Sequence, residues 1–130
     1  MKLIIKGTLM ALNEYSRLGV HKKGKGKNGY YSKRNQAKNE QQELIEWYIK
    51  MGGLDPITKG IKVVVKFHWF EPDRRRDPDN ICFAKKFIMD SLVKQGILQD
   101  DSWKYVKGFV DCFSVDREDP RIEVELMEVP

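Results

Sequence analysis

The sequence has few of the residues that build disulfide frameworks and soft metal sites. Its 130 residues include two cysteines and two histidines. Cys82 and Cys112 do not form a C-x-x-C pair or another metal-ligand spacing, and His21 and His68 are isolated. A zinc site would need more nitrogen and sulfur ligands than this. Zinc is therefore not expected, and the two cysteines are interpreted as reduced side chains near a core.

Long hydrophobic runs are also absent. No stretch approaches the roughly 20 apolar residues of a membrane span. The apolar part of residues 1–7 is too short for a signal peptide. A hydrophobic content of 41% with 33% charged residues fits a globular protein, and the length predicts a single domain over residues 1–130. We expect a cytoplasmic protein without membrane contact.

Charge is distributed unevenly along the chain. Residues 1–50 contain 11 Lys or Arg and 4 Asp or Glu, whereas residues 51–130 contain 13 and 15. This asymmetry suggests a polyanionic partner whose backbone is bound over a broad surface and attacked chemically at one place. It fits a protein without such a partner equally well. The segment at about residues 20–34 is rich in lysine and glycine, and it is expected to be a flexible basic loop. Its candidate DNA-binding residues are Lys22, Lys23, Lys25 and Lys27.

Apolar periodicity predicts six elements in the order β-α-β-α-β-β. Strands are expected at residues 3–9, 61–70, 103–113 and 121–129, and helices at 36–51 and 80–95. The apolar face of the first helix is expected to include Ala37, Leu44, Tyr48 and Met51, with Ile45 and Ile49 beside them. The polar turn at 116–120 suits a hairpin between the last two strands. The fold class is therefore α+β, with helices packed on a mixed sheet.

Three consecutive arginines, Arg74 to Arg76, precede the sequence Asp77-Pro78-Asp79-Asn80. In an extended backbone the carboxylates of Asp77 and Asp79 point the same way, and Pro78 favours that geometry. Both could face one divalent cation while the arginines receive phosphate oxygens. Taken alone, the same residues are also an ordinary helix N-cap and turn.

A second acidic pair, Asp100-Asp101, follows the predicted helix. A helix of about 16 residues spans about 24 Å, so this pair cannot reach the first along the helix. We expect the strand at 103–113 to lie beside the strand at 61–70 and to bring Asp101 to Asp77 and Asp79. Three aspartates suit Mg²⁺ or Mn²⁺. One of two lysines, Lys85 or Lys86, could stabilise charge on phosphoryl oxygens, although two helix lysines are also typical of a solvated face.

Three segments in order resemble the RusA family of Holliday junction resolvases. They are residues 76–80, the stretch Lys86-x-x-x-Asp90-Ser91-Leu92, and residues 96–101, which are similar to D-x-D-N, K-x-x-x-D-A-L and G-ϕ-ϕ-x-D-D, where ϕ is apolar. The best-matched part is residues 74–101, and the flanking strands extend it over 61–127. The resemblance departs at the lysine, because Lys86 follows Asp79 by seven residues instead of the family's four. Lys85 therefore remains an alternative.

The resemblance implies a homodimeric endodeoxyribonuclease that makes paired nicks in a four-way DNA junction during recombination and repair. It implies Mg²⁺ as cofactor, with Mn²⁺ as a substitute. The implied metal ligands are Asp77, Asp79 and Asp101; Lys86 is the implied catalytic lysine, and Asn80, Asp90 and Asp100 are supporting. Arg74, Arg75, Arg76 and Lys85 are expected to face DNA.

Two other functions remain open. One is a non-catalytic DNA-binding protein with the same fold, and the intact aspartate set argues against it. The other is a metal-dependent nuclease that acts on RNA or on other branched nucleic acids.

Overall fold

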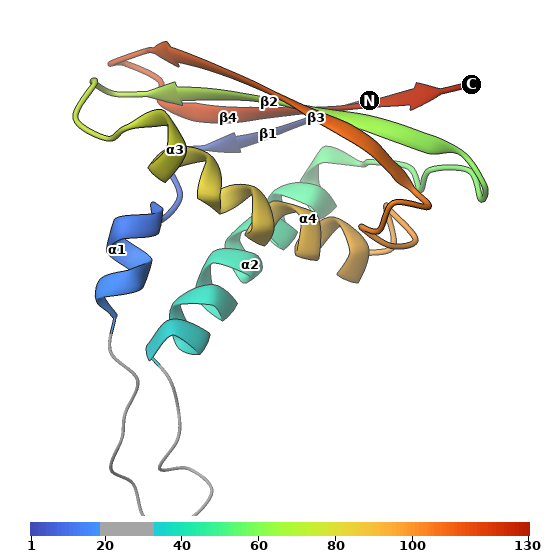
Figure 1. The fold of residues 1–130 in the computed structure, drawn as a ribbon, viewed down its shortest axis with the longest axis horizontal. Helices are drawn as coiled ribbons and strands as arrows, with labels where there is room; N and C mark the ends of the chain where they lie inside the picture. The colour runs from blue at the N-terminus through green and yellow to red at the C-terminus, as the bar shows by residue number, and fades with distance from the viewer. Residues whose placement is uncertain (19–32) are drawn as a thin grey trace, which may run out of the picture.

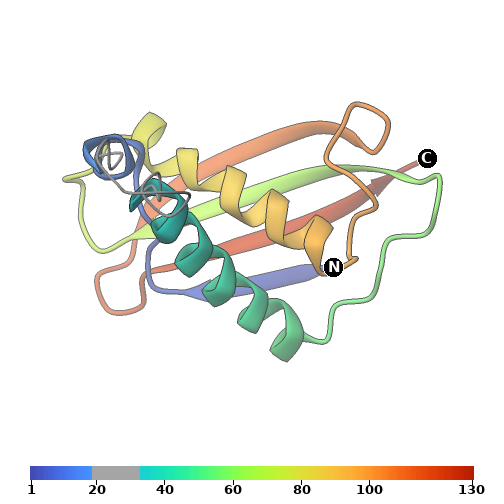
Figure 2. The same ribbon diagram turned by 90° about the horizontal axis from the view of Figure 1, so that it is seen from below.

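The computed structural model describes residues 1–18 and 33–130, so the predicted basic loop and its four lysines lie outside the described residues. A four-stranded mixed sheet has the order β1-β4-β2-β3. The strands are β1 (Lys2–Lys6), β2 (Lys62–Glu71), β3 (Val106–Val115) and β4 (Arg121–Val129). The helical segments are α1 (Leu12–Arg17), α2 (Lys33–Gly52), α3 (Pro78–Ile81), the 3₁₀ helix η2 (Cys82–Ala84) and α4 (Lys85–Lys94). They cover one face of the sheet (Figures 1 and 2), which confirms the α+β class.

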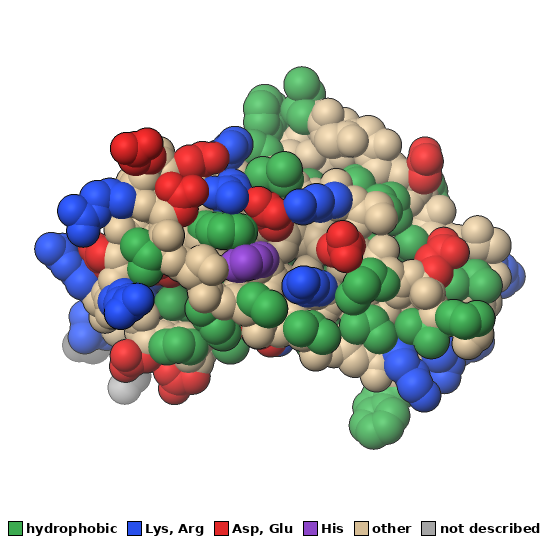
Figure 3. Space-filling view, turned by 90° about the horizontal axis from the view of Figure 1, so that it is seen from above, with side chains coloured by type: hydrophobic (Ala, Val, Ile, Leu, Met, Phe, Trp, Pro, Cys, Tyr) green, Lys and Arg blue, Asp and Glu red, His purple; other side chains and the backbone are tan. Residues whose placement is uncertain are grey.

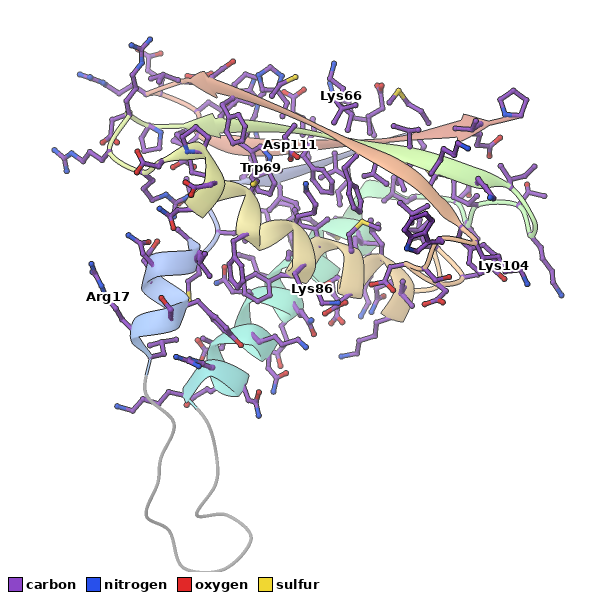
Figure 4. All side chains as sticks on the ribbon, in the orientation of Figure 1. Arg17, Lys66, Trp69, Lys86, Lys104 and Asp111 are labelled. Atoms are coloured by element: carbon purple, nitrogen blue, oxygen red, sulfur yellow. The ribbon has the colours of Figure 1, made fainter. Side chains whose placement is uncertain are left out.

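The two central strands, β2 and β4, supply the sheet side of the core. Their residues alternate between buried and partly exposed positions, as expected where one sheet face is packed and the other is not. The inward side chains are Val63, Val65, Phe67 and Trp69 from β2 and Ile122, Val124 and Leu126 from β4. Among the described residues no helix lies on the opposite face, and Figure 3 shows charged side chains and a histidine there among hydrophobic ones. Lys66 points away from the helices on this face (Figure 4).

The predicted hairpin between the last two strands is wrong. β3 pairs with β2 in parallel, from Val106 opposite Val63 to Val115 opposite Glu71. β4 pairs antiparallel with both β1 and β2, so it lies on the other side of β2 from β3. The physical reason is burial: β4 has a regular buried face that suits a central strand, whereas β3 is more exposed and takes the edge. Residues 116–120 therefore pass the end of β2.

The helix predicted at residues 36–51 is confirmed as α2, and its predicted apolar face is confirmed in part. Leu44 and Met51 are 40% and 68% exposed. The residues buried against the rest of the protein are Ala37, Gln42, Ile45, Glu46 and Ile49. Ala37, Ile45 and Ile49 were predicted on this face, whereas the buried Gln42 and Glu46 are polar, so apolar periodicity could not place them there. Among the described residues, no helix is long and apolar enough to cross a membrane.

The predicted helix over residues 80–95 is divided into three segments. Pro78 occupies the start of α3, a position where its missing N–H costs nothing. The 3₁₀ segment η2 then separates α3 from α4, and because a 3₁₀ helix is wound more tightly, it changes the directions of the side chains that follow. Gly96, with φ +76°, follows the C-terminal end of α4. The break directly precedes Lys85 and Lys86.

Candidate active site

Asp77 and Asp79 lie where the chain leaves β2 and enters α3. Asp77 is the N-cap residue, with an extended backbone, but its carboxylate makes no capping hydrogen bond. The Oδ1 atom of Asp79 accepts the backbone N–H of Asn80 at 3.0 Å. Both residues are exposed. Within residues 1–18 and 33–130, neither carboxylate has an ion-pair partner, so both are available to a ligand.

Arg76 is engaged inside the protein. Its Nε and Nη2 atoms donate to the two carboxylate oxygens of Glu71 at 2.8 and 3.0 Å. Its Nη1 donates to the Leu9 carbonyl at 2.8 Å and to Glu14 at 2.9 Å. Burial lowers the pKa of Arg76, but the hydrogen bonds and charges of Glu71 and Glu14 outweigh it and leave that pKa raised. Arg76 therefore joins the start of the acidic motif to α1 and to the segment before it.

The other two arginines are more open. The side chain of Arg75 is 89% exposed and lies 3.5 Å from Asp73. Arg74 is exposed and borders a cleft of about 270 Å³. The cleft is lined by Glu71, Asp73, Arg74, Arg76, Asp77, Pro78, Ile81, Phe113, Ser114 and Val115. Arg74, which is cationic, and Asp77, which is anionic, thus line the same cleft beside the end of β3.

Asp101 does not reach this cleft within the chain. β3 runs parallel to β2, so the turn before Val106 lies near Val63 at the start of β2, whereas Glu71 is at its other end. The expectation that Asp101 returns to Asp77 and Asp79 is therefore wrong. Asp101 Oδ2 instead lies 3.7 Å from Lys86 Nζ, and Asp100 accepts the N–H of Asp101 at 2.9 Å. Across the described ranges, no group of three or more His, Cys, Asp or Glu side chains could hold a metal ion.

Lys86 and Asp90 form an exposed polar cluster on α4. Lys86 Nζ is 3.1 Å from Asp90 Oδ1, and the Lys86 side chain is 62% exposed. The hydrogen bond that Lys86 donates to Asp90 raises the pKa of Lys86; burial opposes this, and the charges of Asp90 and Asp101 add to it. Asp90 also lies near Lys38 (3.6 Å) and Gln42 (3.4 Å) of α2. Asp90 thus connects α2 to Lys86.

Lys85 has a different partner, which the sequence did not suggest. Its Nζ lies 2.6 Å from Asp111 Oδ2 on β3, and the Nε1 atom of Trp69 donates to Asp111 Oδ1 at 2.9 Å. Figure 4 shows Trp69 and Asp111 on the helix side of the sheet. The sequence did contain one sign of this pairing. Phe109, Asp111 and Phe113 are two residues apart, so they share one face of the strand, and an acid therefore takes an inward position.

A second depression, open to solvent and about 360 Å³ in volume, lies beside both lysines and Asp101. It is lined by Cys82, Phe83, Lys85, Lys86, Met89, Asp101 and Phe109. Burial raises the pKa of the Cys82 thiol, as does the charge of Asp111 and, more weakly, that of Asp79, whereas Lys85 lowers it. The thiol lies 3.7 Å from the backbone carbonyl oxygen of Asp79. Both lysines and Asp101 border one depression, next to the segment that begins with Asp77.

Comparison with known proteins gave one match. The family model described as endodeoxyribonuclease RusA matches residues 16–127. Among curated proteins, none matches the chain. The matched range includes all the aspartates, arginines and lysines described above, whereas Leu9 and Glu14, which bind Arg76, precede it.

Proposed function

The chain belongs to the RusA family of endodeoxyribonucleases, and on this premise we propose that it resolves four-way DNA junctions in recombination and repair, as a Mg²⁺-dependent homodimer that makes paired nicks. The main support is the pair of carboxylates of Asp77 and Asp79, which have no ion-pair partner among the described residues, with the exposed Arg74 in the same cleft as Asp77. Carboxylates are the ligands that hard divalent cations prefer, and arginine binds phosphate oxygens. A site with both suits phosphodiester hydrolysis.

The proposed metal ligands are Asp77, Asp79 and Asp101, with Mn²⁺ as a substitute for Mg²⁺. In donor chemistry the three carboxylates fit such a cation. In geometry one chain does not complete the set, since Asp101 lies beside Lys86 and not beside the other two. The proposal therefore needs a second copy of the chain to contribute Asp101.

The exposed edge strand β3 is the surface proposed for the dimer. Phe109, Val110, Phe113 and Val115 are 38–46% exposed, and the outer edge of β3 is unpaired within the described residues. Proteins normally cover or interrupt so apolar an edge. Antiparallel pairing of two β3 strands would bring the Asp101 turn of one copy, at the start of its strand, to the Asp77 end of the other. Two equivalent sites would then act on two DNA strands, as paired nicking requires.

Junction cleavage is the direct test of this function. The protein is expected to cut a synthetic four-way junction at paired positions in Mg²⁺ and to cut a linear duplex of the same sequence far less. Chelation by EDTA should stop cleavage but leave junction binding, because the basic surface does not depend on the metal. A denaturing gel gives the products and a mobility-shift gel gives the binding. Binding without cleavage would favour the non-catalytic alternative, and preference for RNA or flap substrates would favour the other nuclease.

The proposed dimer predicts a specific effect of charge on β3. Val110→Lys should make the protein monomeric and remove paired nicking, because like charges facing each other across paired strands are destabilising. Ile4→Lys on β1 is a matched control, since Val110 and Ile4 are 43% and 42% exposed, each on an edge strand. Light scattering after size-exclusion chromatography gives the mass. A Val110→Lys protein that stays dimeric, or a monomeric wild type, would contradict the proposed interface.

A further inference from the structure

The Asp111 carboxylate is held between a rigid donor and a cation. Trp69, which is 1% exposed, is fixed in the core and donates to one oxygen. Lys85 binds the other oxygen, and the side chains of Lys85 and Asp111 are 21% and 22% exposed. With both oxygens engaged by protein donors, Asp111 is poorly suited to bind a metal. Its geometry suits a different task, which is to fix the position of the Lys85 ammonium.

The Lys85 ammonium keeps unused hydrogen-bonding capacity at that position. A lysine ammonium has three N–H donors, and within the described residues Asp111 is its hydrogen-bond acceptor. The rings of Phe109 and Phe67 lie at 4.7 and 5.3 Å from Nζ; they attract the cation but leave its remaining donors for an oxygen ligand. Lys85 lines the open depression that also contains Asp101. A phosphate oxygen is the acceptor that matches such a fixed cation.

The neighbouring Lys86 has the same charge as Lys85, but its side chain is held less firmly in one position. Its side chain is 62% exposed and is shared between two carboxylates, Asp90 at 3.1 Å and Asp101 at 3.7 Å. A long exposed side chain must lose rotamer freedom when it binds a ligand. Lys85 has already lost much of that freedom through Asp111 and the two rings. Binding of phosphate by Lys85 therefore costs less conformational entropy.

We infer that Lys85 is the lysine that binds a DNA phosphate next to the cleaved bond, and that Asp111, held by Trp69, is its positioning residue. The inference rests on the proposed function, and it assigns to this chain a carboxylate outside the family signature. Asp111 acts through Lys85 and does not itself touch DNA.

Three variants test the inference with two measurements. Lys85→Met removes the charge, Lys86→Met is the matched neighbour, and Asp111→Asn keeps an oxygen acceptor for Trp69. Affinity for a synthetic four-way junction is measured in EDTA over a range of salt concentrations, and single-turnover cleavage is measured in Mg²⁺. Thermal unfolding of each variant shows whether the fold is kept.

Lys85→Met is expected to reduce the slope of log affinity against log salt by about 0.9, the value of one lost phosphate contact per site. Lys86→Met should leave that slope unchanged. Asp111→Asn should also leave the slope unchanged, because the Lys85 charge remains, but should slow cleavage by about tenfold or more as the ammonium loses its fixed position. A purely structural ion pair would instead lower the unfolding temperature and leave both the salt slope and the rate of the folded protein unchanged.

A Lys85→Met slope equal to that of the wild type would overturn the phosphate contact, as would a reduced slope in Lys86→Met alone. A wild-type cleavage rate in Asp111→Asn would overturn the positioning role. The proposed function fails separately, if the wild-type protein binds the junction and does not cut it. In that case the salt slopes in EDTA still decide the role of Lys85.

Discussion

Asp79→Asn is expected to lower the single-turnover rate of junction cleavage by about 100-fold or more. The loss of one carboxylate removes a proposed ligand of a cation whose contribution to the transition state is several kcal/mol, and each 1.36 kcal/mol corresponds to about tenfold in rate. The substitution preserves shape. Asparagine keeps the Oδ1 acceptor that binds the Asn80 N–H, so the start of α3 should be unchanged.

Junction binding separates this effect from a loss of structure. In EDTA the Asp79→Asn protein should bind the junction as tightly as the wild type or more tightly, since it carries one negative charge less near a polyanion. Asp55→Asn is the control, because Asp55 is likewise an exposed aspartate but lines a different depression. Rapid cleavage by Asp79→Asn in Mg²⁺, or an equal loss in Asp55→Asn, would remove Asp79 from the site.

Local patterns predicted the elements of this fold better than their arrangement. The strand at 121–129 and the alternation of β2 were confirmed, because half-buried strands show a period of two in the sequence itself. The position of β4 between β1 and β2 depends on pairing between residues far apart in the chain, which no local pattern encodes. The short helix α1 was not predicted, since none of its residues is buried and it shows no apolar stripe.

The same limit applies to the site. The motif around Asp77 and Asp79 is local, and the extended backbone of Asp77 was predicted from Pro78; the expectation of an extended Asp79 was wrong, because the helix begins at Pro78 and not at Asn80. The location of Asp101 was not, because it depends on β3 being parallel to β2. Asp111 matches no motif, and its pairing with Lys85 arises where a strand and a helix are packed together.

The arginine next to the motif gives the second large prediction. Arg76→Ala is expected to lower the free energy of unfolding by about 3–5 kcal/mol, because it leaves the Glu71 carboxylate buried without its cation. Glu71 is 6% exposed and receives two hydrogen bonds from Arg76. Lysine should not restore this stability fully, since it cannot donate two parallel hydrogen bonds to one carboxylate. Urea denaturation followed by circular dichroism measures the change.

The neighbouring Arg75 provides the control that distinguishes a structural role of Arg76 from a role in DNA binding. Arg75→Ala should change stability by no more than about 0.5 kcal/mol, as is usual for an exposed side chain. Replacing both partners, Glu71→Leu with Arg76→Met, should recover much of the stability that Arg76→Ala loses, because no buried charge is then left unpaired. If Arg76 instead served mainly to contact DNA, as its place in the arginine run first suggested, Arg76→Ala would keep its stability and lose junction affinity. The bidentate pair with Glu71, together with the bonds to Leu9 and Glu14, predicts the opposite result.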